Sequence, residues 1–213
     1  MNSAPIKTFL PNRIRHFLGK TIAVGRRAGI WWRVSRELSG ERVRDQTVLR
    51  RALLSAPFDI FRGLDRWRDP MVTENCRIKA EGIGIFSVRA YTDDLYHTLP
   101  SRELAVISII RSHLNSGDVF VDAGANIGIY SVLASRLVGP EGRIFSFEMM
   151  PETARILRGH LTTNHCANAT VIEGALSDKA NETVRAYVNG NKHGQSSIIA
   201  KDASVEIIVT TTT

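Results

Sequence analysis

Short apolar runs alternate with helical patterns of apolar residues over the second half of the chain. The runs with the length and composition of buried strands are 119–121, 144–147 and 169–173. Between the first two, apolar residues recur every three or four positions at 129–138, and a second such stripe follows Pro151. Short strands that alternate with helices predict an α/β fold with a parallel sheet and right-handed crossovers.

Weaker patterns flank this unit on both sides. Apolar residues between 76 and 90 predict a short β-hairpin, and Ser101 is placed to cap a helix that runs through Leu114. Asp93-Asp94 could attract a cation, but two adjacent carboxylates are more typical of a solvated turn. Beyond the third strand, extended segments are predicted around the turn Asn189-Gly190-Asn191; they are 183–188, 197–199 and 205–210.

Residues 1–70 differ from the rest in charge and in pattern. They hold 15 Lys or Arg against 6 Asp or Glu, so the net charge of +7 belongs to this segment. We expect a basic helical N-terminal extension over 1–70. Pro57 and Asp69-Pro70 break its pattern, so it ends near residue 70 and is followed by a partial domain over 71–213 with its core at 95–213.

Arginines interleaved with apolar and aromatic residues in this extension allow three interpretations. Amphipathic helices of this kind often cover a domain edge and leave the guanidinium groups in water, which is the interpretation we favour. A peripheral contact with an anionic membrane is the second, and binding to nucleic acid is the least expected.

The turn after the first parallel strand carries the candidate chemistry. Asp122, Gly124 and Gly128 form the pattern D-x-G-x-x-x-G, and Glu148 ends the following strand. A carboxylate at that strand end accepts hydrogen bonds from ribose hydroxyls in nucleotide-binding units. The extra acid Asp122 would repel a pyrophosphate but attract the ammonium and sulfonium of S-adenosylmethionine, so the pattern favours this methyl donor over NAD.

These residues also resemble the FkbM-type S-adenosylmethionine-dependent methyltransferases, over about 95–213. The resemblance implies a Rossmann-like class I methyltransferase fold and methyl transfer to a hydroxyl of a sugar or secondary metabolite, so the acceptor would be a small molecule or a glycan. The segments that carry it are 117–128, 145–148 with Pro151, 173–178 and 194–197.

Carried over residue by residue, the resemblance implies a cofactor site. Glu148 would hold the ribose, and Met149 would pack on adenine, with Ala175 and Ser177 beside the base. The residues that would line the methionine end are Asp122, Gly124, Ala125, Asn126 and Gly128.

Each role has a structural alternative. Asp122 would simply accept backbone N–H bonds in its turn, Asn126 would cap the following helix, and Glu148 would be an exposed carboxylate at a strand end. Met149, next to Met150, would be ordinary core packing. Gly128 would in either case let its helix pack close to the strand.

The chain departs from the family after the extended segments. Family members continue into a fourth strand with a Lys-x-Asp-x-Glu-Gly-type motif, which this sequence lacks. We therefore expect either a truncated chain, which we favour, or a sheet completed by another polypeptide. The strand that carries Asp122 would then form a sheet edge with an exposed apolar face. Much of the wall that positions an acceptor would also be absent.

The remaining features assign little chemistry. His193 could act as a general base, but a histidine in a glycine-rich loop is more often idle, so no catalytic residue is assigned. Cys76 and Cys166 lack metal-ligand spacing and are expected to be reduced thiols without a metal. The start of the sequence does not resemble a secretory signal, which predicts a cytoplasmic location. A non-catalytic module docked on an anionic surface and an NAD-binding Rossmann protein remain the alternative functions.

Overall fold

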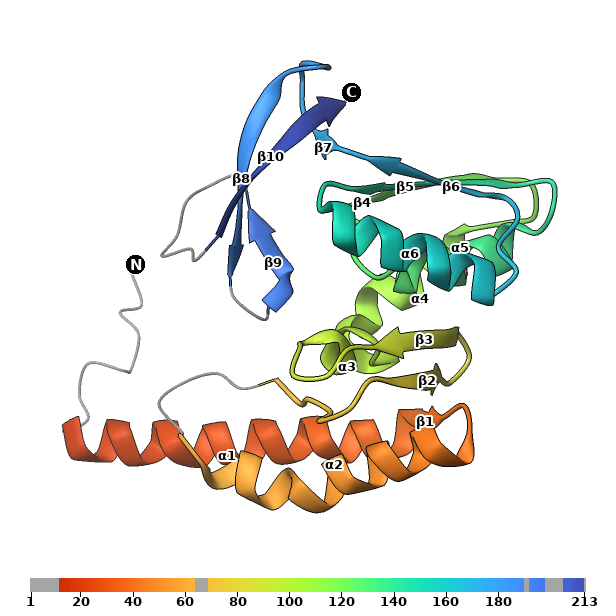
Figure 1. Ribbon diagram of the computed structural model, residues 1–213. Coiled ribbons are helices and arrows are strands. Elements are labelled where there is room, and N and C mark those ends of the chain that lie inside the picture. Colours follow the sequence, from red (N-terminus) through yellow and green to blue (C-terminus); the bar gives the residue numbers. More distant parts are fainter. Residues whose placement is uncertain (1–11, 64–68, 190–191, 198–204, 213) are drawn as a thin grey trace, which may run out of the picture.

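The computed structural model describes residues 12–63, 69–189, 192–197 and 205–212. At the base of the molecule, helices α1 (Asn12–Glu37) and α2 (Val43–Phe61) pack side by side, as Figure 1 shows. Each helix buries one face: Ile30, Trp31 and Val34 of α1, and Val48 and Leu49 of α2, are buried against the rest of the chain. Among the described helices, none has the length and apolar character needed to cross a membrane.

Arg27 of α1 holds the end of α2 in place. Its guanidinium is buried and donates hydrogen bonds of 2.8–3.3 Å to the carbonyl oxygens of residues 59, 60, 62 and 63. The last carbonyls of a helix have no partner within the helix and carry partial negative charge, so a buried cation is stabilised there.

The prediction that Pro57 breaks the N-terminal segment is wrong. Pro57 lies inside α2, which continues to Phe61. A proline in a helix removes one backbone hydrogen bond. Here α2 also buries Ala52 and Ala56 in the core and is anchored by Arg27, and this packing outweighs the loss.

A three-stranded antiparallel sheet lies on these helices. Strands β2 (Cys76–Ala80) and β3 (Gly84–Val88) form the predicted hairpin, and β1 (Leu38–Gly40) pairs with the other edge of β2. One continuous hydrophobic core runs from α1 and α2 through this sheet to the helices above it. The division at residue 70 stays a prediction, although β1 and β2 pair across it.

Two predictions for the segment after the hairpin are wrong. Asp93 and Asp94 do not form a solvated turn: Asp94 is 1% exposed, and Arg89 pairs with both of its carboxylate oxygens at 2.8 Å. The cationic partner lowers the pKa of Asp94 against the opposing effect of burial. Ser101 does not cap a helix; its backbone N–H donates to Glu37 instead. The elements here are α3 (Asp94–His97), the 3-10 helix η2 (Pro100–Glu103) and α4 (Leu104–His113).

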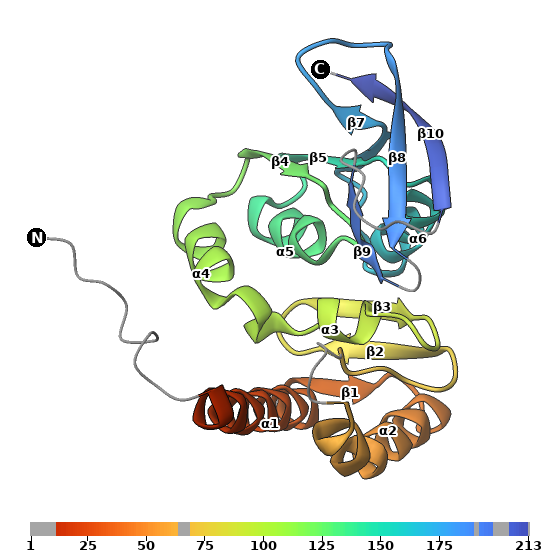
Figure 2. The same cartoon turned by 90° about the vertical axis from the view of Figure 1, so that its left-hand side faces the viewer.

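The predicted βαβαβ unit is confirmed. Its three strands pair in parallel in the order β4-β5-β6, which is the Rossmann-like arrangement expected from the sequence. The elements are β4 (Val119–Ala123), α5 (Ile129–Val138), β5 (Arg143–Glu148), α6 (Pro151–Thr163) and β6 (Ala169–Glu173). Helices α5 and α6 lie between this sheet and the antiparallel sheet, as Figures 1 and 2 show.

The opposite face of the parallel sheet is more open. Val119 and Val121 point away from α5 and are more than half exposed. Strand β4 lies at the sheet edge among the described strands, as the sequence predicted.

The last described segment forms a third sheet beside the parallel one. Strand β10 pairs in parallel with β7 and antiparallel with β8, which pairs in turn with β9. The strands are β7 (Ala175–Leu176), β8 (Thr183–Asn189), β9 (Lys192–Ser197) and β10 (Val205–Thr212). The predicted extended segments at 183–188 and 205–210 are confirmed. Of the segment predicted at 197–199, residues 198 and 199 lie outside the described residues.

Two polar side chains, one in α6 and one just after it, attach the hairpin to the parallel unit. Asn164, just after α6, accepts from the backbone N–H of Ile85 at 2.8 Å and donates to its carbonyl at 2.7 Å. The imidazole of His160 lies against Phe86, and its Nε2 accepts from the backbone N–H of Ser87 at 2.8 Å. Its Nδ1 lies 2.8 Å from the Ile127 carbonyl and must donate to it, so one neutral tautomer satisfies both contacts.

We expect replacement of Arg27 by Met to lower the free energy of unfolding by about 2–3 kcal/mol, because several helix-end carbonyls lose a charged donor. Urea denaturation measures this change. The control Arg26→Met, at an exposed position of the same helix, should alter it by less than about 0.5 kcal/mol. Equal effects of the two substitutions would contradict the anchoring role of Arg27.

The pH dependence of stability should report on His160. Burial lowers the pKa of His160, so the unfolded chain takes up the proton first as the pH falls. Stability from the neutral imidazole is therefore present above about pH 6.5 and is lost below it, by up to about 1.4 kcal/mol per pH unit. Denaturation of His160→Gln across this range should lack that contribution, whereas His113→Gln, at an exposed position, should keep it.

Candidate functional site

The turn between β4 and α5 is built from residues with left-handed backbone conformations. Gly124, Asn126 and Gly128 have φ values of 77°, 49° and 87°. Glycine adopts this conformation without strain, and asparagine tolerates it better than most residues. The backbone N–H groups of Gly124 and Ala125 both donate to the Phe147 carbonyl, at 3.0 and 2.8 Å, and this ties the turn to β5.

The two glycines of the pattern serve different purposes. A Cβ at Gly124 would meet no atom within 4 Å, so this side of the turn is open for the approach of a ligand. A Cβ at Gly128 would lie 2.3 Å from Leu157 Cδ1. The expected close contact of Gly128 is therefore with helix α6 rather than with a strand.

Glu148 ends β5 with its carboxylate beside the glycine turn. Its Oε2 accepts from the backbone N–H of Asn126 at 2.8 Å, and its Oε1 accepts from that of Met150 at 2.9 Å. The side chain is 7% exposed, which excludes the exposed strand-end alternative. Burial raises the pKa of Glu148 and the nearby Asp122 charge adds to it, while the two backbone N–H groups oppose the shift.

Asp122 lies at the end of β4 and faces helix α5. Its Oδ2 accepts from the Ser131 hydroxyl at 2.5 Å, and Ser131 in turn lies 2.8 Å from the Ser146 hydroxyl on β5. Burial raises the pKa of Asp122, and hydrogen bonds from the side chain and the backbone N–H of Ser131 oppose the shift. At least one of its carboxylate oxygens is therefore engaged within the fold, by a side chain rather than by the backbone of its own turn.

Asn126 does not cap the helix that follows it. Gly128 occupies the cap position of α5, and no side chain caps that end of the helix. The Asn126 Oδ1 atom is buried and has no hydrogen-bond partner in the described part of the chain. A buried polar atom without a partner is costly in a native fold, so it points to a bound group as its partner.

The predicted adenine-side residues are brought together in part. Met149 packs against a small apolar cluster that contains Ala175 and Val209, and the backbone N–H of Gly174 donates to the Glu148 carbonyl at 3.1 Å. Ser177 is exposed beyond β7, with its hydroxyl on Asp178. The structure thus gathers Glu148, Met149 and Ala175, while Ser177 has no described side-chain contact with them.

The supporting residues Ser131, Ser146 and His160 were not predicted from the sequence. His160 holds the Ile127 carbonyl inside the turn. A signal for His160 was present, since it shares one helical face with the buried residues Thr153 and Leu157. The serines look like ordinary solvated positions in a sequence.

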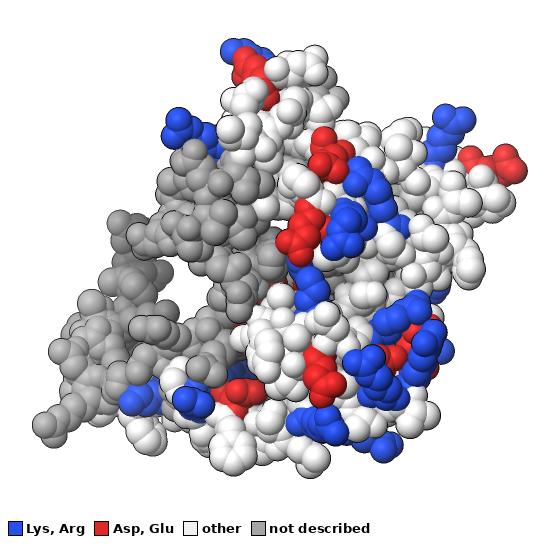
Figure 3. Space-filling view, viewed as in Figure 1, with Lys and Arg blue, Asp and Glu red and all other residues white. Residues whose placement is uncertain are grey.

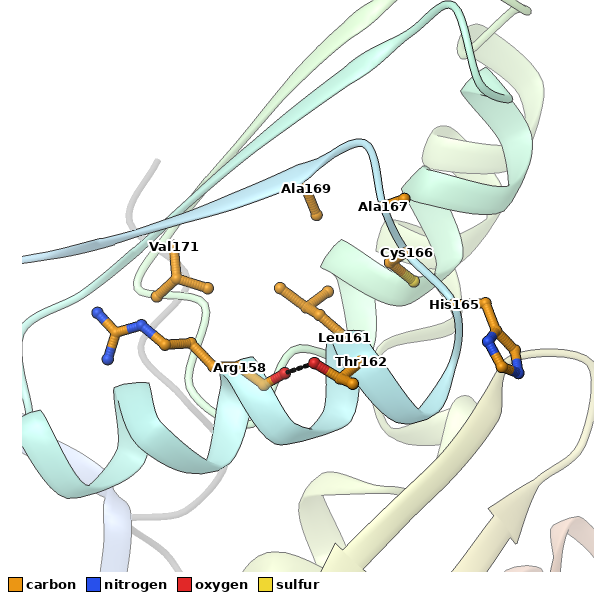
Figure 4. A pocket seen from close by; sticks show the side chains of 8 residues that line it. All are labelled: Arg158, Leu161, Thr162, His165, Cys166, Ala167, Ala169 and Val171. Carbon is orange, nitrogen blue, oxygen red and sulfur yellow. Dashed lines mark hydrogen bonds between the residues drawn. The ribbon is translucent and has the colours of Figure 1, made fainter.

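A hollow of about 520 Å³ between α6 and β6 is separate from this site. Figure 4 shows that Arg158 and Thr162 line it from α6 and that Ala169 and Val171 line it from β6. Cys166, which also lines it, is buried, and burial raises the pKa of its thiol. None of the predicted cofactor residues belongs to this lining.

The described residues add neither a metal-ligand cluster nor a catalytic base to this site. Among the described residues, no group of three or more His, Cys, Asp or Glu side chains could hold a metal ion. Cys76 and Cys166 are free thiols, as expected. The side chain of His193 lies outside the described residues.

No family model matches the chain, but curated relatives match part of it. The chain is 26% identical over 98 residues to a probable cobalt-precorrin-6B C(15)-methyltransferase of Sulfolobus acidocaldarius. The matched stretch covers 44% of this chain and 51% of that protein. The chain is also 29% identical over 77 residues to a protein-L-isoaspartate O-methyltransferase of Ignicoccus hospitalis, and this stretch covers 36% of each protein. The chain spans about half the length, or less, of these relatives.

Solved structures match comparable parts of the chain. The precorrin-6y C5,15-methyltransferase of Geobacter metallireducens shares 32% identity, with 32% of this chain and 37% of that chain covered and a TM-score of 0.30. Aeropyrum pernix fibrillarin with bound S-adenosyl-L-methionine shares 22% identity over 52% and 54%, with a TM-score of 0.31. The β4-α5-β5-α6-β6 unit has a Rossmann-like topology, with its three strands parallel in sequential order, and part of this chain is similar in sequence to methyltransferases.

Proposed function

We propose that this chain binds S-adenosylmethionine at the turn from Asp122 to Gly128 and at Glu148, and that it belongs to a methyltransferase. The observation that carries the proposal is the buried Glu148 carboxylate, which two backbone N–H groups hold beside the turn. The partial identity with two curated methyltransferases supports it.

The residues of the site fit this cofactor. Each Glu148 oxygen already accepts one hydrogen bond and keeps a second acceptor site, so the carboxylate can bind two adjacent ribose hydroxyls. The unpartnered Asn126 Oδ1 offers an acceptor for an ammonium or hydroxyl group. Met149 and Ala175 would provide an apolar surface for the adenine ring.

Charge also favours this cofactor over a dinucleotide. When bound, S-adenosylmethionine supplies an electrophilic methyl group on a cationic sulfonium. Asp122 and Glu148 both have pKa values raised by burial, so each carboxylate is stabilised by an approaching cation. A pyrophosphate beside the same two side chains would be repelled.

For the acceptor we propose a hydroxyl of a small molecule or a glycan, in keeping with the resemblance to FkbM-type enzymes. The two curated relatives are named for other acceptors, a cobalt-precorrin and a protein isoaspartate. The catalytic base is unassigned, and a cytoplasmic location stays a prediction.

Replacement of Glu148 by Gln tests the proposal. We expect the affinity for S-adenosylmethionine, measured by isothermal titration calorimetry, to fall about tenfold or more, because hydrogen bonds to a charged acceptor are lost. The matched control is Glu173→Gln, since Glu173 pairs in register with Glu148 at the end of the neighbouring strand and its carboxylate forms an exposed ion pair with Arg158. This control should change the affinity by less than about twofold.

Circular dichroism should first establish that both variants are folded. No measurable binding by the wild-type chain, or equal losses in the two variants, would reject the proposed site. Enhanced NADH fluorescence that S-adenosylhomocysteine does not reverse would instead favour a dinucleotide-binding protein.

A further inference from the structure

Helix α2 presents a row of large apolar side chains to solvent. Val43, Leu54, Phe58 and Phe61 are 87%, 79%, 77% and 65% exposed. Their positions repeat at helical spacing, so they share one face, opposite the buried Val48 and Leu49 of the same helix. The fold uses only one side of α2, and the second apolar side is not needed for the core.

Helix α1 continues this pattern. Ile22 and Trp32 are more than half exposed and lie on one face with Gly25 and Gly29, where a Cβ would meet no atom within 4 Å. Arg36 stacks over the Trp32 ring with 4.9 Å between guanidinium carbon and ring centre. Large apolar groups alternate on this face with open glycine positions, and Gly25, Gly29 and Trp32 line a hollow of about 550 Å³ beside Tyr96 of α3.

The exposed charges on the two helices are basic, and one of them, Arg51, forms an exposed ion pair of 2.9 Å with Glu74. No acidic side chain of α1 or α2 belongs to their exposed, described positions, because Asp45 is buried and Glu37 and Asp59 are partly buried. The arginines at exposed positions of the two helices are Arg26, Arg36, Arg44, Arg50 and Arg51.

The two helices form the outermost layer of the molecule (Figure 1). On the face shown in Figure 3, Lys and Arg gather over the lower half, and uncharged side chains project from its lower edge. This layer lies on the far side of the antiparallel sheet from the glycine turn, so it can meet a partner without covering the candidate cofactor site.

We propose that the exposed face of α1 and α2 docks on the surface of an anionic lipid bilayer. Phenylalanine, leucine and tryptophan side chains insert at the boundary between headgroups and acyl chains, while arginines contact the lipid phosphates. Nucleic acid would satisfy the arginines but leave Leu54, Phe58 and Phe61 in water. A second copy of this chain would bring arginines of like charge together across a twofold interface. The proposal is independent of the methyltransferase activity.

Sedimentation of the full chain with lipid vesicles tests this surface. We expect binding to vesicles of phosphatidylcholine mixed with phosphatidylglycerol, and much weaker binding to phosphatidylcholine alone. The double variant Leu54→Ser/Phe58→Ser should lower the partition coefficient about tenfold or more. The control Ile109→Ser changes an apolar residue on α4 that is also more than half exposed. This control should alter the partition coefficient by less than about twofold.

A second pair of variants tests the charges. Arg50→Gln/Arg51→Gln should weaken binding to the anionic vesicles and reduce its dependence on salt. The control Arg155→Gln, at an exposed position of α6, should retain the wild-type binding to anionic vesicles and its dependence on salt. All substituted positions are exposed, so circular dichroism should show wild-type folding.

Three results would overturn the proposal. The first is no sedimentation with either vesicle, or equal losses in the test and control variants. The second is salt-dependent binding to nucleic acid without binding to vesicles. The third is a concentration-dependent dimer that Leu54→Ser/Phe58→Ser abolishes while vesicle binding is absent.

Discussion

The neutral imidazole of His160 joins parts of the fold that are distant in sequence. It donates to the Ile127 carbonyl in the glycine turn and accepts from Ser87 in the hairpin, while its own helix packs on β5 and β6. Because each ring nitrogen has one partner, the ring cannot take up a proton without losing a contact. The geometry of the candidate site therefore depends on a residue that touches none of its predicted ligand-binding side chains.

The parts of the fold that could be predicted from the sequence are those with local signals. The βαβαβ unit has strand-length apolar runs, helical stripes and glycine or proline at its boundaries, so its elements follow from short-range physics. The errors at Pro57, Asp94 and Ser101 have a common cause. Each position is controlled by a contact outside its own helix or turn. The helix around Pro57 is held by core packing and by Arg27, Asp94 pairs with Arg89 five positions earlier, and the backbone of Ser101 bonds to Glu37.

The candidate site was predictable to a similar degree. Glu148 and the glycines stand out because strand ends and tight turns restrict which residues fit. The hydrogen bond from Ser131 to Asp122, and that between Ser131 and Ser146, were not predictable, since a serine on a helix or strand carries no mark of burial in the sequence. The unpartnered Asn126 Oδ1 likewise emerges only when the backbone of the turn is known.

The bonds between Asn164 and Ile85 span 79 positions, and this separation has a consequence for biosynthesis. Strand β3 leaves the ribosome long before the residue that completes its packing exists. At about 5–20 residues per second, roughly 4–16 s pass between the two. During this interval Phe86, fully buried in the finished fold, lacks its cover of α6. The nascent chain should therefore be a substrate for chaperones that bind exposed apolar strands until α6 has been synthesised.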